Sequence, residues 1–276
     1  GDPDPVAIAW HGAQRTGPLL VRDGWFESPA PQPEASKRAA LRLITPAGGG
    51  DRTCLLMAAW NDHTYATRTR LARALAARGI GSVVLHQPFY GPRRPDPAHG
   101  QPIRTVSDFM VMGRAALDEG RSLLRTLGDE GHRVGVSGYS MGGNMAALIA
   151  ATVPFPVATA PLAASHSPAP VYLDGVLRHG IAWEALGGEE AAAGRLRRIM
   201  LTASVLRLPP PPHAAAAVIV AARSDGYVPR EASDDLHRHW PGSVLRRVPG
   251  GHATLLWFHT ETLATAVADA FLRTFG

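Results

Sequence analysis

A serine flanked by glycines is the stretch of this sequence best suited to chemistry. The segment Gly138-Tyr139-Ser140-Met141-Gly142 has the spacing G-x-S-x-G. Apolar and small residues at 134–136 indicate a buried strand before it, and the run 145–151 indicates a helix after it. The turn that joins this strand to this helix is sharp and strains its central residue. Glycines on either side of that residue let the backbones of strand and helix approach each other. A Gly-rich turn that merely contains serine fits the motif too, but its setting predicts that Ser140 is a nucleophile.

A serine hydroxyl is a weak nucleophile at neutral pH, so a base has to remove its proton. His252 is the candidate base because it lies on a Gly-rich loop after the last predicted strand, and Asp225 follows the strand before it. The order Ser, Asp, His is typical of hydrolases with this motif. Asp225 is expected to orient the imidazole and stabilise the imidazolium. Alternatively, His252 is a surface loop histidine and Asp225 is an aspartate that caps the next helix. Asp174 is a weaker rival for the role of the acid.

A tetrahedral intermediate at Ser140 needs two N–H donors for its negative oxygen. The first is expected from Met141, at the start of the helix behind the serine, where unpaired N–H groups gather. The second is expected from the loop after a strand at 53–59, with Trp60 as first choice and Asn61 as second. Further residues are expected to line the substrate pocket: Asp62, His63, Tyr139, Phe89 and Tyr90.

Asp62 and His63 form a polar pair in that same loop. No further ligands are spaced to complete a metal site around them, so no metal is expected. Asp62 is expected instead to cap a helix that begins near residue 65, with His63 beside the pocket. Cys54 is the sole cysteine, which excludes an intramolecular disulfide and a zinc site built from thiolates. No cofactor is expected.

Composition narrows the class of protein further. A chain of 276 residues with 45% hydrophobic residues is expected to form a single domain over 1–276. The net charge is +5, but the arginines are scattered and no long basic run occurs, so nucleic-acid binding is not expected. Attraction to an anionic membrane or substrate stays open. Neither a transmembrane run nor a secretory signal is evident, so the cytoplasm is the expected location.

Short apolar strands alternate with helices along most of the chain. Strands are expected at 38–45, 53–59, 80–85, 134–136, 156–162, 216–221 and 243–248, and helices at 65–78, 106–128, 145–153, 230–240 and 259–275. This alternation predicts an α/β fold, a mostly parallel central sheet of about eight strands with helices on both faces. Ser140, Asp225 and His252 each follow a strand, so all three are expected at the carboxyl edge of the sheet.

Two regions depart from the alternation. Residues 1–36 are expected to form an irregular N-terminal arm, because Pro29, Pro31 and Pro33 block regular pairing. Residues 163–213 are too long for a plain crossover and are expected to insert a small helical cover, with helices at 172–186 and about 189–207.

Several segments together are similar to one known family. They are Gly24–Pro29, Asp62-His63, Gln87–Gly91, Val106–Gly113, Gly138–Gly143, Asp225–Pro229, Trp240–Gly242 and Gly250–His252. The chain resembles the α/β-hydrolase superfamily and, more narrowly, the abhydrolase-domain-containing group eighteen. This resemblance implies the α/β-hydrolase fold and the Ser140, His252 and Asp225 triad, and says little about the substrate. The family loop tends to read Gly-Thr-Gly-Asp-His, whereas Ala59-Trp60-Asn61-Asp62-His63 stands here, so a smaller or differently shaped acyl pocket is expected.

Three functions follow from these residues. The first is a serine hydrolase that cleaves a small-molecule ester or thioester through an acyl-serine. The second is an acyltransferase that passes the same acyl group to an alcohol or amine. The third is a non-catalytic ligand-binding member of the fold. The sequence makes no prediction of the oligomeric state.

Overall fold

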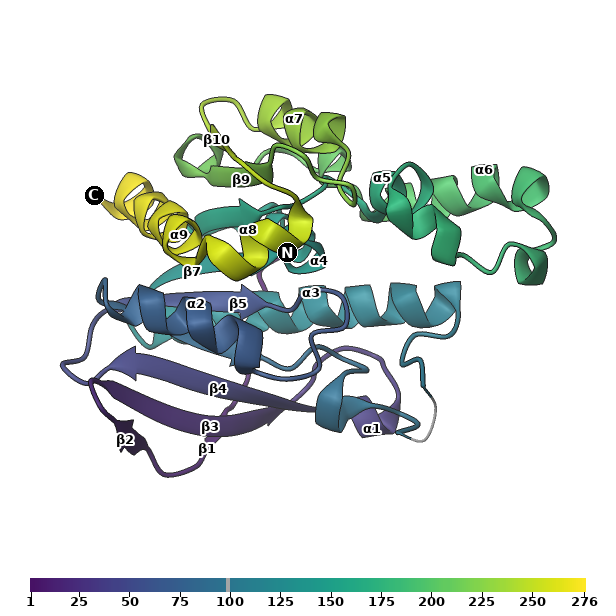
Figure 1. Cartoon of the computed structure of the whole chain (residues 1–276). Coiled ribbons are helices and arrows are strands. Elements are labelled where there is room, and N and C mark those ends of the chain that lie inside the picture. Colours follow the sequence, from purple (N-terminus) through teal and green to yellow (C-terminus); the bar gives the residue numbers. More distant parts are fainter. Residues whose placement is uncertain (98–99) are drawn as a thin grey trace.

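The computed structural model describes residues 1–97 and 100–276. Its strands are β1 (Ala9–Trp10), β2 (Gln14–Thr16), β3 (Leu19–Glu27), β4 (Arg38–Pro46), β5 (Arg52–Met57), β6 (Ile80–Leu85), β7 (Arg133–Tyr139), β8 (Ala158–Leu162), β9 (Val218–Ala222) and β10 (Val244–Val248). They form a ten-stranded sheet in the order β1-β3-β4-β6-β5-β7-β8-β9-β10, and β2 pairs with β3 (Figure 1). The expectation of about eight strands falls short because the described N-terminal region adds strands of its own.

That N-terminal region is antiparallel. β3 pairs with β4 along its whole length, from Leu19 opposite Pro46 to Glu27 opposite Arg38, and β4 pairs antiparallel with β6. The expected irregular arm over residues 1–36 is therefore wrong for β1, β2 and β3. The prolines at 29, 31 and 33 lie after β3, between it and the short helix α1 (Glu34–Lys37), so they interrupt no strand pairing.

The remaining strands, β5 to β10, pair in parallel. Helices α2 (Ala66–Ala76) and α9 (Thr260–Phe275) cover one face, where Leu75 and Val267 pack with Leu56 of β5. Helices α3 (Val106–Asp129), α4 (Met141–Ala150) and α7 (Arg230–His239) cover the other. Burial of apolar side chains on both faces is what holds a parallel sheet together, so the expected arrangement of sheet and helices is confirmed.

The segment 163–213 is helical but less regular than expected. It holds α5 (Pro168–Leu173), α6 (Glu189–Met200) and short 3₁₀ turns at Val176–Gly180, Glu184–Leu186, Leu201–Ala203 and Val205–Arg207. The expected helix at 172–186 is wrong, since α5 ends at Leu173 and only short turns follow. Figure 1 shows α5 and α6 extending beyond the carboxyl ends of β5 and β7, on the side where the site residues lie.

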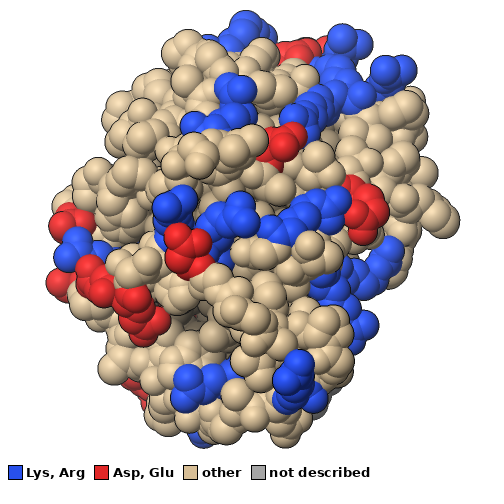
Figure 2. Space-filling model, turned by 90° about the vertical axis from the view of Figure 1, so that its left-hand side faces the viewer, with Lys and Arg blue, Asp and Glu red and all other residues tan. Residues whose placement is uncertain are grey.

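The side of the molecule that carries the amino ends of the parallel strands faces the viewer in Figure 2. Lys and Arg side chains on it lie among Asp and Glu side chains, with broad uncharged areas between them. This face therefore presents no continuous surface of a single sign. Within the described part of the chain, no helix combines the length and apolar character needed to cross a bilayer.

Candidate active site

Ser140 occupies a strained turn between β7 and α4. Its φ of 56° and ψ of −117° lie in a region that residues other than glycine rarely adopt. The glycines on either side are sterically required. A Cβ atom on Gly138 would lie 2.5 Å from the carbonyl carbon of Gly142, and one on Gly142 would lie 2.4 Å from Met57 O. The close approach of backbones that the motif predicts is present.

The start of α4 leaves N–H groups free beside Ser140. The N–H groups of Gly143 and Asn144 donate to Ser140 O, at 2.9 and 3.1 Å. The N–H groups of Met141 and Gly142 have no hydrogen-bond partner among residues 1–97 and 100–276. Unpaired N–H groups at a helix start attract negative charge, so Met141 N can stabilise an oxyanion formed at Ser140.

Asp225 and His252 lie together at the same edge of the sheet. Asp225 Oδ2 is 2.7 Å from His252 Nδ1, while Asp225 Oδ1 accepts hydrogen bonds from the backbone N–H groups of Tyr227 and Val228. Both side chains are largely buried, at 6% exposure for Asp225 and 13% for His252. Asp225 therefore fixes its own turn and binds the imidazole. The alternative that it caps the next helix is wrong, since α7 has no side-chain cap.

The imidazole is placed next to the serine turn by Tyr139. The Tyr139 hydroxyl donates a 2.6 Å hydrogen bond to His252 O, and the two rings lie 5.1 Å apart. Burial raises the pKa of Tyr139, so its hydroxyl stays a neutral donor. In the described structure Ser140 Oγ makes no hydrogen bond to His252. Such contacts commonly tighten only when substrate is bound.

The loop after β5 distinguishes the two expected oxyanion donors. Asn61 N donates to the Tyr90 hydroxyl at 3.3 Å, so this N–H is already engaged. Trp60 N has no hydrogen-bond partner among the described residues, and Trp60 lines the same cavity as Ser140, whereas Asn61 does not. This geometry favours Trp60 over Asn61.

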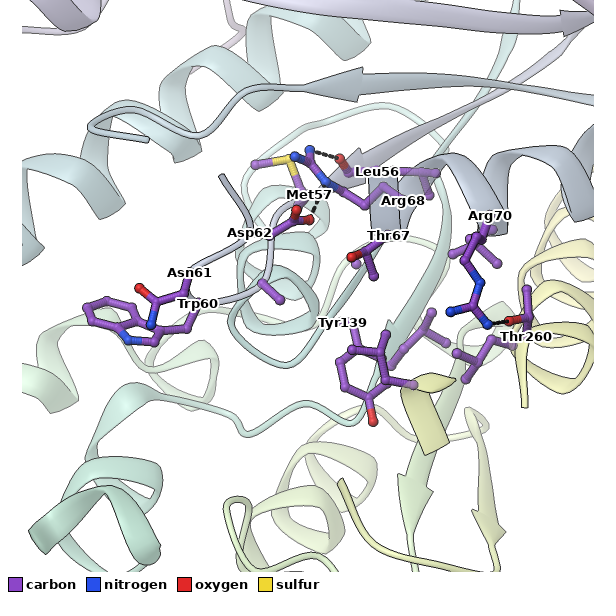
Figure 3. Close-up of a pocket in the computed structure, with 16 residues that line it drawn as sticks. Leu56, Met57, Trp60, Asn61, Asp62, Thr67, Arg68, Arg70, Tyr139 and Thr260 are labelled. Carbon is purple, nitrogen blue, oxygen red and sulfur yellow. Dashed lines mark hydrogen bonds and ion pairs between the residues drawn. The ribbon is translucent and has the colours of Figure 1, made fainter. Parts of the chain in front are cut away.

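A buried ion pair between Arg68 and Asp62 holds the loop after β5 in place. Arg68 Nε donates to Asp62 Oδ2 at 2.7 Å, and Arg68 also donates to Leu56 O (Figure 3). Two further acceptors are Leu85 O and Thr64 O. Asp62 therefore pairs with Arg68, and the expectation that it caps the helix near residue 65 is wrong, since α2 has no side-chain cap. From the sequence, Arg68 belongs to the polar face of α2, yet only 5% of it is exposed.

A small cavity of about 40 Å³ opens directly at Ser140. Three aromatic rings, those of Trp60, Phe109 and Tyr172, lie 5.7 to 6.0 Å apart around it. Its other lining residues are Met141, Asn144, Ser165, Ser167, Pro168, Val171, Leu177 and Val228. Sequence reasoning missed most of these, because α5 and the turn after it bring them to Ser140 from the segment 163–213. The conspicuous segment Val106–Gly113 is the one signal that pointed toward Phe109.

A much larger apolar groove, of about 880 Å³, adjoins this cavity. It runs between α3, α4 and the turns near residue 203, and its apolar lining includes Met112, Leu117, Met145, Leu148 and Leu208. The groove and the cavity share Phe109, Met141, Asn144 and Pro168. An apolar chain attached at Ser140 can therefore continue into the groove.

The remaining residues expected at the pocket lie elsewhere. Tyr139 and Asp62, together with Asn61, line a second pocket of about 150 Å³ between α2 and α9, which shares Trp60 with the cavity at Ser140 (Figure 3). Phe89 and Tyr90 are buried against Met112, and His63 stacks on Tyr90 with ring centres 4.7 Å apart. These three residues support the loop walls and do not line the cavity at Ser140.

Two other expectations concern an acid and a metal. Asp174, the weaker rival acid, pairs with Arg197 in an exposed position, with both side chains more than two-fifths accessible. Asp174 therefore forms an ion pair within the segment 163–213 and is not the partner of His252. Within residues 1–97 and 100–276, no three His, Cys, Asp or Glu side chains gather as metal ligands do.

The chain matches one family model and resembles several solved structures. A family model described as alpha/beta hydrolase domain containing 18 matches residues 2–197 and 187–273. Acetyl xylan esterase 1 from Thermoanaerobacterium sp. JW/SL YS485 superposes with a TM-score of 0.66 at 13% identity, over 98% of this chain and 95% of the esterase. A cold-adapted esterase from an Arctic intertidal metagenomic library gives 0.61 at 17%, over 96% and 99%. Est1E from Butyrivibrio proteoclasticus gives 0.57 at 18%, over 86% and 94%. At such identities the likeness describes the fold.

Proposed function

We propose that this chain, which belongs to the alpha/beta hydrolase domain containing 18 family, hydrolyses carboxylic esters through an acyl-serine at Ser140. The observation that carries the proposal is the 2.7 Å contact between Asp225 Oδ2 and His252 Nδ1 beside the strained Ser140 turn. A carboxylate bound to Nδ1 leaves the other imidazole nitrogen free to accept the serine proton. The esterases that share the fold support the same reading.

The mechanism assigns each proton to a group. Ser140 Oγ attacks the ester carbonyl carbon while its proton passes to His252 Nε2, and Asp225 stabilises the imidazolium. The carbonyl oxygen becomes negative and is bound by the N–H groups of Met141 and Trp60. The bond to the alcohol breaks, and His252 gives its proton to the leaving oxygen. Water then attacks the acyl-serine by the same route, with His252 as base, and releases the carboxylic acid.

The apolar groove supports an acyl group larger than acetyl. The cavity at Ser140 has room for only the first atoms of a chain, and the groove of about 880 Å³ continues from it along α3 and α4. Burial of each further methylene contributes about 0.8 kcal/mol. Esters of medium-length fatty acids are therefore the expected substrates, and acetate esters are expected to react more slowly.

Thioesters fall under the same proposal, because attack by Ser140 Oγ and the oxyanion are common to both substrates. Transfer of the acyl group to an alcohol or amine uses the same acyl-serine, and analysis of products with competing acceptors separates it from hydrolysis.

Replacement of the nucleophile tests the proposal. Ser140→Ala is expected to lower kcat/KM for p-nitrophenyl butyrate by a factor on the order of 10⁵. Ser137→Ala, in the strand β7 that leads to Ser140, is the matched control, since the Ser137 hydroxyl donates to Ala160 O and Ser137 does not line the cavity at Ser140. Turnover by Ser140→Ala at the wild-type rate would contradict the proposal.

A further inference from the structure

Ser167 occupies a helix start at which its hydroxyl has lost its usual partner. It is the N-cap residue of α5, and an N-cap serine normally accepts a hydrogen bond from the N–H of the second or third helical residue. Here the third residue is Pro170, which has no N–H, and the first is Pro168. The remaining N–H, that of Ala169, makes no bond to the cap either. The sequence Ser-Pro-Ala-Pro thus frees the hydroxyl from helix capping.

Ser167 is one of the residues that line the cavity at Ser140, and its hydroxyl is buried. Ser167 is 0% exposed, and its Oγ has no hydrogen-bond partner among the described residues. A buried hydroxyl without a hydrogen-bond partner is unfavourable, because it has lost water and gained nothing in return. Ser165, which lines the same cavity, differs, since its Oγ accepts a 3.3 Å hydrogen bond from Ser167 N. A buried polar group without a partner, in the cavity that holds a nucleophile, indicates a ligand that supplies the partner.

The position of the cavity indicates which part of an ester Ser167 meets. The cavity includes Met141 and Trp60, the two donors assigned to the carbonyl oxygen, and it shares four residues with the apolar groove. Asp225 and His252, which handle the leaving alcohol, are not among its lining residues. Ser167 therefore lies on the acyl side of the scissile bond, close to the carbonyl.

We propose that Ser167 Oγ hydrogen-bonds an oxygen carried by the acyl chain close to the scissile carbonyl, as in hydroxyacyl, oxoacyl or alkoxyacyl esters. This inference rests on the proposed esterase function and narrows its substrate class. A plain alkyl chain in the cavity leaves the hydroxyl unpaired, whereas an oxygen at this place satisfies it. Sites that pair a substrate oxygen discriminate strongly against analogues that lack one. The apolar groove then holds the rest of the chain.

The test uses two esters of the same length. The acyl chain of p-nitrophenyl methoxyacetate has an ether oxygen where p-nitrophenyl butyrate has a methylene. The ratio of their kcat/KM values is measured for the wild type and for Ser167→Ala, so that the difference in intrinsic reactivity cancels. The ratio of methoxyacetate to butyrate is expected to fall about tenfold in the variant, the loss of one hydrogen bond. Ser137→Ala is the control, because the Ser137 hydroxyl donates to Ala160 O and does not line the cavity, and it is expected to keep the wild-type ratio.

Thermal unfolding separates a binding role from a structural one. Because Ser167 Oγ makes no bond within the described chain, Ser167→Ala is expected to leave Tm unchanged or raised. An equal ratio in wild type and Ser167→Ala, with both esters turned over, would overturn this inference and leave the esterase proposal standing. A Tm that falls together with the ratio would assign Ser167 a structural role and also overturn it. Turnover of neither ester by the wild type would remove both proposals.

Discussion

The two sides of Ser140 are built differently. One side, which we call the acid–base side, is joined by short hydrogen bonds and by tilted ring contacts; its residues are Asp225, His252, Tyr139 and Tyr227. On the other side, the acyl side, lie the small cavity and the apolar groove, lined by side chains of α3, α4 and the segment 163–213.

Under the proposed function, we expect the acid–base side to determine the rate of reaction and the acyl side to determine which ester reacts. The acid–base side depends on directional contacts, so the loss of one atom is expected to remove most of the activity. The acyl side depends on shape and burial, so a change there is expected to alter which ester reacts. Hydrophobic discrimination is limited to about 1–3 kcal/mol per methylene, whereas removal of the group that orients a base costs several orders of magnitude in rate.

Among the variants that compare the two sides, the largest effect is expected for Asp225→Asn. The amide oxygen can still accept the hydrogen bonds from Tyr227 N and Val228 N, so the turn is expected to fold. The amide N–H₂ facing His252 Nδ1 favours the tautomer that cannot accept the serine proton, and kcat is expected to fall on the order of 10⁴-fold. Steady-state kinetics with p-nitrophenyl butyrate measure this. The control is Asp174→Asn, which changes an exposed aspartate paired with Arg197. Equal losses of kcat in the two variants would contradict a special role of the acid–base side.

A smaller and selective effect is expected for Gly113→Phe. Gly113 lines the groove from α3, and a Cβ atom added there meets nothing within 4 Å. The new ring is expected to fill the groove and lower kcat/KM for p-nitrophenyl octanoate roughly tenfold, with the acetate ester unchanged within about twofold.

Gly128→Phe is the control for the groove, because Gly128 lies in the same helix, has equally open surroundings and does not line the groove. Both variants replace a helical glycine, so both are expected to gain about 0.5–1 kcal/mol of stability or to lose none. Equal loss of activity toward acetate and octanoate in Gly113→Phe would show that the groove does not bind the acyl chain.

The smallest effect on activity at neutral pH is expected for His86→Phe, which belongs to neither side. Burial, and then the nearby guanidinium of Arg68, lowers the pKa of His86 from 6.5 to about 4. The unfolded chain therefore takes up this proton first, so stability is full above pH 6.5 and declines as the pH falls toward 4, by about 3 kcal/mol.

Urea unfolding at pH 7.0, 5.5 and 4.5 checks the His86 prediction. The variant is expected to lose less stability than the wild type over this range, while the phenyl ring keeps the stacking contact with Tyr65. The comparison of variant and wild type separates loss of activity at low pH caused by unfolding from loss of activity caused by protonation on the acid–base side. An identical decline in both proteins would rule out His86 as the source.

The parallel part of the sheet could be predicted from short apolar runs. The strand expected at 80–85 is β6 itself, and the helix expected at 106–128 differs from α3 by one residue at its end. The N-terminal strands were missed because their pairing depends on β4, which lies outside the region where the prolines occur. The burial of Arg68 could not be predicted, because its carbonyl partners Leu56 and Leu85 belong to strands 12 and 17 residues away in the sequence.

The site divides in the same way. Ser140, Asp225 and His252 could be placed at one edge because each lies within four residues of the end of a strand, and strand ends are visible in the sequence. The acyl side depends on how α5 and its flanking turns fold back over Ser140. No spacing in the sequence records that Ser167, Tyr172 or Leu177 reaches the cavity. The helix α8 (His252–Phe258), which starts at the histidine itself, was also missed because its seven residues give too short a periodic pattern.

The central claim is that Ser140, His252 and Asp225 act as one nucleophilic unit. Reaction of the full chain with a fluorophosphonate, followed by peptide mass spectrometry, tests it most directly. The account predicts one phosphonylated residue, Ser140, with labelling that is lost in Ser140→Ala and strongly slowed in Asp225→Asn. Labelling at another residue, or equal labelling rates in wild type and Asp225→Asn, would contradict it.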